Sequence, residues 1–335
     1  MTPASHIPDL PSPGGLQDRQ GRSIRYLRLS LTDRCNFRCD YCSAAGLEAP
    51  EALLGAGELA RLVSLFARLG VRRVRLTGGE PTLRRDVVEV AAAVRAVPGI
   101  EEVALTTNGH RLAELAGPLH RAGVGAVNVS LDTLDPAMLE RVSGRGARLA
   151  DVLAGLDAAA AEGFAALKVN TVVMGGVNDG ELAALTRHAW SRGATPRFIE
   201  LMPFGSGRPV PSAEVERRLG EAGVALSPDP ARGWGPARYL RGRCADGAGG
   251  LVGFIGALTE NFCASCNRAR ISADGAFQAC LGGHERVPLR QLLREGASDA
   301  LLEDRVRGAL WRKEPRHHMD DPARLVLLPM RGIGG

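Results

Sequence analysis

Six of the seven cysteines form two triplets, Cys35-x3-Cys39-x2-Cys42 and Cys263-x2-Cys266-x13-Cys280. Three thiolates are one ligand fewer than a structural zinc site normally takes. An iron–sulfur cubane held by three cysteines, by contrast, keeps one iron open for a small molecule. The first triplet therefore predicts a reactive iron–sulfur cluster, and the second triplet indicates another.

Zinc is the alternative at both triplets. A distant residue could complete a zinc site at the first triplet, and His284, at the spacing Cys280-x3-His284, could complete one at the second. For the second triplet, spacing alone does not decide between zinc and iron–sulfur. Cys244 stands apart from both triplets, and we interpret it as an ordinary small residue.

The length and composition indicate a globular α/β protein. The chain has 335 residues, of which 45% are hydrophobic, so one large domain with a smaller appendage is expected. It shows no apolar run of the roughly eighteen residues that a membrane span needs and no signal pattern at its start. We infer a cytoplasmic protein without a membrane partner, in which clustered cysteines bind metal rather than form disulfides.

The basic residues are almost all Arg, with Lys168 and Lys313 as the exceptions, and the net charge is +5. Arg side chains suit phosphate recognition through paired hydrogen bonds. Aromatic residues make up only 4% of the chain and do not interleave with a basic segment, which argues against nucleic acid as a partner. A small charged molecule is the favoured ligand.

Short β-branched runs alternate with longer segments of helical spacing from residue 24 onward. This alternation predicts right-handed βαβ units and a parallel sheet, either doubly wound or curled into a full or partial barrel. Near residue 226, a stretch rich in Pro and Gly indicates the start of a second region. The predicted strands are roughly 24–31, 72–77, 102–107, 126–131, 167–173 and 196–202.

A polar motif follows each predicted strand. Because the carboxyl ends of parallel strands meet at one face, we expect these motifs to build a single pocket. The motifs are the first cysteine triplet, Thr77-Gly78-Gly79-Glu80-Pro81, Thr106-Thr107-Asn108-Gly109, Ser130-Leu131-Asp132, Asn170 and Glu200-Leu201-Met202-Pro203.

The first triplet, placed after the first strand, resembles the signature loop of the radical S-adenosylmethionine (SAM) superfamily. The resemblance implies an α/β fold with a partial (β/α)6 TIM-type barrel, whose open iron binds the amino and carboxylate groups of SAM. Gly78-Gly79-Glu80 is similar to the superfamily's glycine-rich motif, where missing side chains admit the methionine amino group. The positions that match SAM contacts are Gly78, Gly79, Glu80, Thr106, Asn108, Ser130 and Met202.

The second triplet, with Asn267-Arg268-Ala269-Arg270 directly after Cys266, resembles the C-terminal cluster of the GTP 3′,8-cyclase family of molybdenum cofactor biosynthesis. The chain's last residues, Met330 to Gly335, resemble that family's Gly-Gly tail, which projects into the active site. The resemblance also implies a set of basic residues around GTP and its triphosphate. They are Arg28, Arg73, Arg75, Lys168, Arg197, Arg268 and Arg270.

The resemblance implies a lyase that converts GTP to 3′,8-cyclo-7,8-dihydro-GTP. The implied cofactors are SAM and two 4Fe–4S clusters, one for each cysteine triplet. In the family, a 5′-deoxyadenosyl radical takes the 3′ hydrogen of GTP, the sugar carbon attacks C8 of guanine, and the second cluster binds the guanine base. The implied protein partners are a second copy in a homodimer and a downstream cyclic pyranopterin monophosphate synthase.

This interpretation divides the chain into three parts. Residues 1–22 are expected to be a flexible segment, residues 23–225 the radical SAM partial barrel, and residues 226–335 a region with the second cluster, substrate contacts and the Gly-Gly tail. A radical SAM peptide maturase with an auxiliary cluster and a non-enzymatic metal sensor are the alternative functions.

Three further features have no assigned role. Ser43-Ala44 stand where the family usually carries Met-Pro after the third cysteine. His317 and His318 lie in a polar stretch near the end, and we expect both at the surface.

Overall fold

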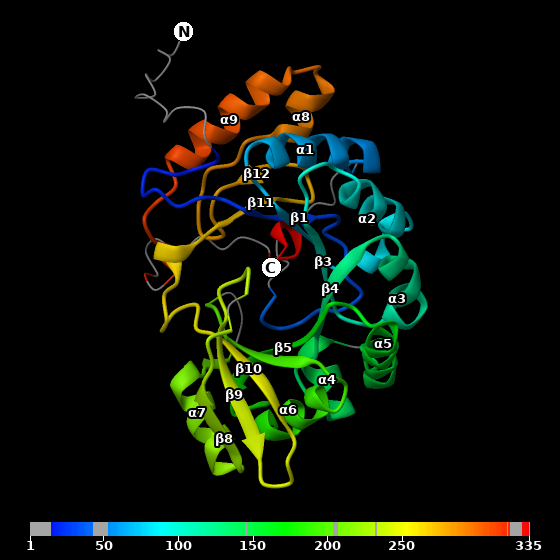
Figure 1. Ribbon diagram of the computed structural model, residues 1–335, viewed down its shortest axis with the longest axis vertical. Helices are drawn as coiled ribbons and strands as arrows, with labels where there is room; N and C mark the ends of the chain where they lie inside the picture. Colours follow the sequence, from blue (N-terminus) through cyan, green and yellow to red (C-terminus); the bar gives the residue numbers. More distant parts are fainter. Residues whose placement is uncertain are drawn as a thin grey trace.

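Six parallel strands, in chain order, form the centre of one curved sheet in the computed structural model (Figure 1). The structure describes residues 15–42, 53–144, 146–203, 207–231, 233–319, 321 and 330–334. All six predicted runs are strands, and each pairs in parallel with the next, which confirms the predicted partial (β/α)6 barrel. The strands are β1 (Tyr26–Ser30), β2 (Arg73–Thr77), β3 (Glu102–Thr107), β4 (Val124–Ser130), β5 (Ala166–Gly175) and β6 (Thr195–Glu200).

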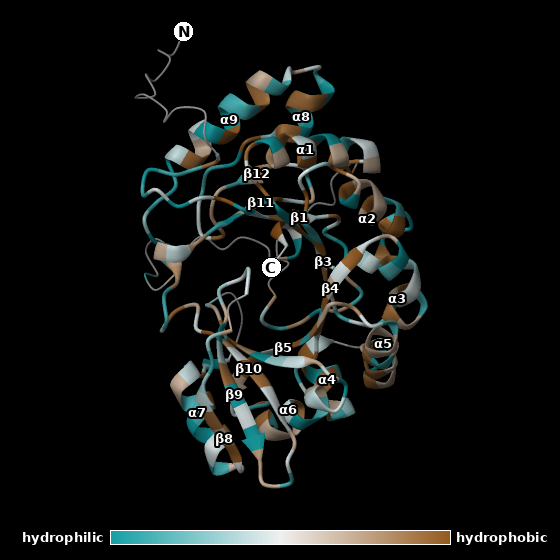
Figure 2. Cartoon of the chain, viewed as in Figure 1, coloured by the Kyte–Doolittle hydropathy of each residue, from teal (hydrophilic) through white to brown (hydrophobic). Residues whose placement is uncertain are grey.

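Amphipathic helices connect these strands and bury their apolar faces against the sheet (Figure 2). In α1 the buried residues Leu59, Leu62, Val63 and Phe66 recur at helical spacing, as the sequence predicts. α4 begins at Pro136, the residue type that fits a first helical position. The helices are α1 (Ala56–Arg68), α2 (Val87–Arg95), α3 (Leu112–Arg121), α4 (Pro136–Ser143), α5 (Leu149–Glu162) and α6 (Leu182–Trp190).

Polar and apolar residues alternate along the barrel strands. Leu27 and Leu29 of β1 lie in the hydrophobic core, whereas Tyr26 of the same strand contacts Arg73 and Arg75 of β2. Successive strand residues point to opposite faces of a sheet, so this second set faces the barrel interior. Apolar residues of these strands therefore lie in the hydrophobic core on one face of the sheet, while polar and basic residues face the barrel interior.

The strands after β6 extend both edges of the same sheet. β10 (Gly249–Ile255) pairs in parallel with β6, and β11 (Arg268–Ile271) pairs in parallel with β1. The loop between β10 and β11 therefore runs from one edge of the barrel to the other, and it carries Cys263 and Cys266. The domain boundary predicted near residue 226 stays a prediction.

The remaining strands extend this sheet or pair with it. β7 pairs with β5, while β8, β9 and β12 complete the sheet order β12-β11-β1-β2-β3-β4-β5-β6-β10-β9-β8. No helix in the described ranges is long and apolar enough to cross a membrane. These elements are β7 (Arg208–Pro209), α7 (Ser212–Glu221), β8 (Val224–Pro228), β9 (Arg238–Cys244), β12 (Phe277–Gln278), α8 (Leu289–Arg294), α9 (Asp299–Trp311) and α10 (Met330–Ile333).

Candidate active site

The first cysteine triplet lines a cavity at the carboxyl ends of the barrel strands. Cys35, Cys39 and Cys42 share this cavity with residues that follow β2, β3, β4 and β6. The arrangement is the one expected for parallel α/β barrels, where strand ends and their loops build the site. All of the predicted SAM contacts line the same cavity, namely Gly78, Gly79, Glu80, Thr106, Asn108, Ser130 and Met202.

Gly78 and Gly79 allow the loop before Cys35 to approach the end of β2. A Cβ atom at Gly78, where φ is +149°, would lie 2.4 Å from the carbonyl oxygen of Thr32, and one at Gly79 would lie 2.3 Å from that of Arg34. The N–H of Gly79 donates to the Thr32 carbonyl at 2.7 Å. The glycines thus have a packing role next to the cofactor role that the resemblance implies, because any side chain here would displace the cysteine loop.

Glu80 ties the end of β2 to the end of β3. Its carboxylate accepts hydrogen bonds from Thr107 Oγ1 at 2.8 Å and from the backbone N–H of Asn108 at 2.7 Å, and Thr82 donates to it as well. Burial raises the pKa of this carboxyl group, and the surrounding donors oppose that effect. Glu80 therefore fixes the strand ends from which the cavity is built.

Tyr41 and Asp132 are cavity residues to which the sequence analysis assigned no role. The Tyr41 hydroxyl donates to Asp132 Oδ2 at 2.5 Å, and Asp132 also accepts from the N–H of Val172 at 2.8 Å. Burial raises the pKa of Asp132 to about 6. Asp132 belongs to the Ser130-Leu131-Asp132 motif, so its place at the end of a strand could be predicted from the sequence. Its hydrogen bond with Tyr41 of the cysteine loop could not.

The second triplet lines another cavity. Cys263, Cys266 and Cys280 share it with Arg268 and Arg270. His284, the candidate fourth zinc ligand, is exposed and does not line this cavity. The structure therefore brings together the three thiols but not His284, the fourth ligand that the spacing suggested for a zinc site.

Cys266 differs from the thiols of the first triplet in its electrostatic surroundings. Burial raises the pKa of Cys35, Cys39 and Cys42 to about 11 each. Burial also raises the pKa of Cys266, but Arg268 and Lys313 outweigh it and bring the value down to about 7. The second site therefore favours a thiolate at Cys266 before any metal is present.

Both donor sets fit an iron–sulfur cluster. All six cysteines are free of disulfides, and thiolate is the ligand that such clusters use. Within the described ranges, no three His, Cys, Asp or Glu side chains gather as ligands of a single metal ion. Each triplet instead places its sulfurs around a cavity.

The predicted substrate residues lie on strands whose polar faces point into the barrel, and some reach the two cavities. Arg75 donates to Thr106 Oγ1, which lines the first cavity, at 3.1 Å. Arg268 and Arg270 line the second cavity. The set consists of Arg28 on β1, Arg73 and Arg75 on β2, Lys168 on β5, Arg197 on β6, and Arg268 and Arg270 on β11.

Tyr26 lies among these cations, and sequence reasoning missed it. Arg75 donates to its hydroxyl, and the guanidinium groups of Arg73 and Arg75 lie 5.4 and 5.8 Å from the centre of its ring. Burial raises the pKa of Tyr26, but Arg75, Arg28 and Arg73 outweigh it and bring the value down to about 7. Tyr26 thus supplies a hydrogen-bond acceptor among the basic residues of the barrel interior.

The cations of the basic interior crowd one another. Arg73 forms an ion pair with Glu102, yet its Nε is buried without a hydrogen-bond partner. Burial, together with Arg197, Arg73 and Arg75, lowers the pKa of Lys168 to about 8. Buried cations are stable when anions pair with them, so this region is suited to a multiply charged anion.

The end of the chain enters the barrel, where the short helix α10 lies at the centre of the curved sheet (Figure 1). The carbonyl oxygen of Gly334 accepts from Arg28 Nε at 2.9 Å and from Arg270 Nη1 at 3.0 Å. Gly334 has a φ of +71°, and a Cβ atom there would lie 2.6 Å from Thr77 Cγ2. Gly335, Ser43 and Ala44 lie outside the described residues.

The expectation that His317 lies at the surface is wrong. His317 is buried, and it lines the second cavity. Its Nε2 lies 2.9 Å from the carbonyl oxygen of Ala257, and its backbone N–H donates to Cys263 Sγ at 3.5 Å. The polar composition of this stretch concealed the burial, because the polar groups there bond to the cysteine loop.

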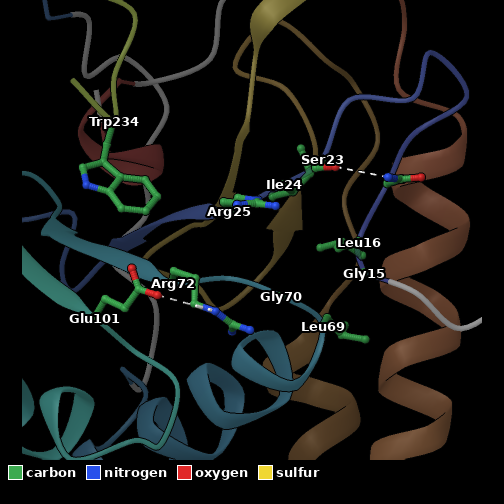
Figure 3. A pocket seen from close by; sticks show the side chains of 11 residues that line it. Gly15, Leu16, Ser23, Ile24, Arg25, Leu69, Gly70, Arg72, Glu101 and Trp234 are labelled. Atoms are coloured by element: carbon green, nitrogen blue, oxygen red, sulfur yellow. Dashed lines mark hydrogen bonds and ion pairs between the residues drawn. The ribbon is translucent and has the colours of Figure 1, made fainter. Parts of the chain in front are cut away.

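A separate cavity of about 310 Å³ lies where the segment around Gly15 meets the loops before β2 and β3 (Figure 3). Trp234, Arg25 and Leu16 line it, and Arg72 forms an ion pair of 3.9 Å with Glu101 beside them. No predicted site residue lines this cavity.

Two family models match this chain. A family model described as Radical SAM superfamily matches residues 29–189, and one described as Molybdenum Cofactor Synthesis C matches residues 194–319. The chain is 44% identical over 314 residues to a GTP 3′,8-cyclase of Heliobacterium modesticaldum, covering 91% of this chain and 95% of that protein. It is 40% identical over 334 residues to a GTP 3′,8-cyclase of Pseudomonas entomophila, covering 97% and 99%.

Among solved structures, Streptococcus suis SuiB bound to S-adenosylmethionine is similar with a TM-score of 0.58 and 15% sequence identity. The similarity covers 84% of this chain and 68% of that chain. At this level of identity it shows a shared fold.

Proposed function

The chain belongs to the GTP 3′,8-cyclase family of radical SAM enzymes, and we propose that its basic barrel interior binds GTP between the two cysteine sites. The reaction is the conversion of GTP to 3′,8-cyclo-7,8-dihydro-GTP, the first step of molybdenum cofactor biosynthesis. Its cofactors are SAM and two 4Fe–4S clusters.

The cysteine triplets are the proposed ligands of the two clusters. Cys35, Cys39 and Cys42 would hold the cluster that binds SAM, and Cys263, Cys266 and Cys280 would hold the cluster next to the guanine base. With SAM bound, the first cluster supplies a one-electron cleavage that yields a hydrogen-abstracting carbon radical.

The chain's own residues bind, orient and shield the reactants. Gly78, Thr106 and Met202 are among the proposed SAM contacts, because they line the cavity of the first triplet. The seven basic residues of the interior would neutralise the triphosphate and hold the ribose near the first cavity. The tail at Gly334 would exclude water, since its backbone already bonds to Arg28 and Arg270.

One observation carries this proposal more than any other. A set of buried cations, including the partnerless Nε of Arg73, lies on strands that also border a thiol-lined cavity. Three negatively charged phosphates would balance the charge of these cations. The second sulfur site would then lie next to the guanine base, and the first next to the ribose of the same nucleotide.

Two cysteine variants test the assignment. In an anaerobic assay with GTP, SAM and reductant, Cys35→Ser should form no 5′-deoxyadenosine, because SAM would lose its cluster. Cys266→Ser should keep some SAM cleavage but form no cyclised nucleotide. The assignment would fail if Cys35→Ser still cleaved SAM, or if Cys266→Ser cyclised GTP at the wild-type rate.

The homodimer, the downstream cyclic pyranopterin monophosphate synthase and the cytoplasmic location stay proposals that rest on the family. Light scattering of the purified, cluster-loaded protein would test the first. A mass near one chain's 35.4 kDa would contradict the homodimer.

A further inference from the structure

Lys313 is one of only two lysines in the chain, and it lies beside the second cysteine triplet. Its side chain is buried, with 6% of the residue exposed. The ammonium Nζ lies 3.6 Å from Cys266 Sγ and donates to the carbonyl oxygen of Arg268 at 3.1 Å. A positive charge is thus held against one sulfur of the second site.

The segment that carries Lys313 is fixed on both sides of this residue. The Lys313 N–H donates to the Leu310 carbonyl at 3.0 Å, at the end of α9. Arg22 donates to the carbonyl oxygens of Glu314 and Pro315, each at 2.8 Å, and its guanidinium also reaches the Cys263 carbonyl at 2.9 Å. These hydrogen bonds therefore fix the backbone that places the ammonium group beside the sulfur.

The neighbouring cation, Arg268, has a different arrangement. Its Nη2 lies 3.8 Å from Cys266 Sγ, and its guanidinium lies 4.8 Å from the centre of the Phe262 ring. Of these two cations, Lys313 lies nearer to the sulfur, and its ammonium group is the more compact charge.

We propose that Lys313 sets the reduction potential of the second 4Fe–4S cluster by donating a charged hydrogen bond to the Cys266 sulfur. Reduction adds one electron to the cluster, and a fixed cation next to a ligand stabilises that added negative charge. Net charge and hydrogen bonds to the sulfurs are two determinants of cluster potential. The inference rests on the second cluster of the proposed function.

Lys313→Met tests the role, because methionine fills similar space without charge or N–H donors. The midpoint potential is measured in the anaerobically loaded full-length chain by dithionite titration, following the electron paramagnetic resonance signal of the second cluster. A Cys35→Ser background removes the signal of the first cluster. At a fixed potential, the ratio of reduced to oxidised cluster should fall at least tenfold, a shift of about 59 mV for a one-electron couple.

Two further variants separate charge from structure. Lys313→Arg keeps the charge, so its ratio of reduced to oxidised cluster should change by less than tenfold. Arg312→Met removes an adjacent cation that is half exposed and paired with Glu285, so it should leave the midpoint unchanged. If Lys313→Met does not load the cluster, Lys313→Gln is measured under the same tenfold criterion.

A midpoint that stays at the wild-type value in Lys313→Met or its Gln substitute, with the cluster present, would overturn the inference. So would an equal downward shift in Lys313→Arg. Iron and sulfide analysis of the wild-type chain distinguishes these results from a failure of the proposed function, which would show as a missing second cluster.

Discussion

Lys168 lies among arginines in the barrel interior, and its positive charge depends on pH. Burial, followed by Arg197, Arg73 and Arg75, lowers its pKa to about 8. Its ammonium group is therefore present in the free protein below pH 8 and is lost above it. A bound triphosphate would stabilise the charged form, so the pKa should rise when GTP binds.

This difference predicts a pH dependence of GTP binding. Below about pH 8 the affinity should not depend on Lys168 titration, whereas above it each pH unit should weaken binding by up to about tenfold until the pKa of the complex is reached. Lys168→Arg should remove this dependence, because a guanidinium keeps its charge. Isothermal titration calorimetry of cluster-loaded protein without SAM checks both.

Tyr26 needs its own control in that experiment. Its pKa of about 7 means that its ionisation also adds negative charge as the pH rises, and so also weakens GTP binding. The comparison is therefore made in a Tyr26→Phe background. An unchanged slope after Lys168→Arg in that background would place Lys168 away from the phosphates.

At the scale of elements, the approach of two loops decides where the first cysteine lies. The loop after β1 packs against the turn after β2, and the N–H of Glu80 donates to the Arg34 carbonyl at 2.8 Å. A Cβ atom at Gly79 would also lie 2.7 Å from the Asp33 carbonyl oxygen. Both contacts are with backbone, which cannot move aside as a flexible side chain would.

Gly79→Ala should therefore displace the loop that leads to Cys35. We expect a chain that folds but loads the first cluster poorly, with iron content falling toward about four atoms per chain from about eight. Gly180→Ala is the matched control, because a Cβ atom there meets nothing within 4 Å. Full iron loading of Gly79→Ala would show that the close approach is not required.

Much of this element-level picture could be predicted from the sequence. The six strands, the helices between them and the convergence of motifs at the strand ends follow from periodicity, because one buried face imposes a regular pattern. The additions of β10 next to β6 and β11 next to β1 could not be read this way. They depend on pairing between segments that are far apart in the chain.

The residues that were missed share a physical reason. Tyr26, Asp132 and His317 each gain their role from a partner on another element, respectively Arg75, Tyr41 and the cysteine loop at Cys263. Their own neighbours in the sequence carry no sign of these partners. Residues in a family motif, such as the cysteines and Gly78, were found because their spacing alone is informative.

At the scale of the whole molecule, the N-terminal hairpin, residues 17–23, contacts the loop of the second cysteine site. Arg22 and Asp18 form a buried ion pair. The guanidinium of Arg22 also donates to the carbonyl oxygens of Cys263, Glu314 and Pro315. One side chain thus joins the start of the chain, the loop between β10 and β11, and the segment after α9.

Replacing Arg22 should weaken all three connections at once. We expect Arg22→Met to destabilise the protein by about 3–5 kcal/mol, the usual cost of leaving one partner of a buried ion pair alone. Loading of the second cluster should fall more than that of the first. Arg19→Met, in the same hairpin but exposed, is the control.

Thermal unfolding, followed by circular dichroism, measures the loss of stability. The iron content of each cluster measures the loss of loading. A melting temperature equal to that of Arg19→Met would contradict the role of Arg22. An Asp18→Asn/Arg22→Met double variant should recover part of the loss, because no unpaired charge stays buried.

The proposed position of GTP between the two cysteine sites is tested most directly with GTP carrying deuterium at its 3′ carbon. The wild-type enzyme should transfer deuterium to 5′-deoxyadenosine, as detected by mass spectrometry, because the ribose lies next to the SAM cavity. Cys266→Ser should still cleave some SAM but transfer far less deuterium. Wild-type 5′-deoxyadenosine without deuterium, formed while GTP is consumed, would contradict this placement.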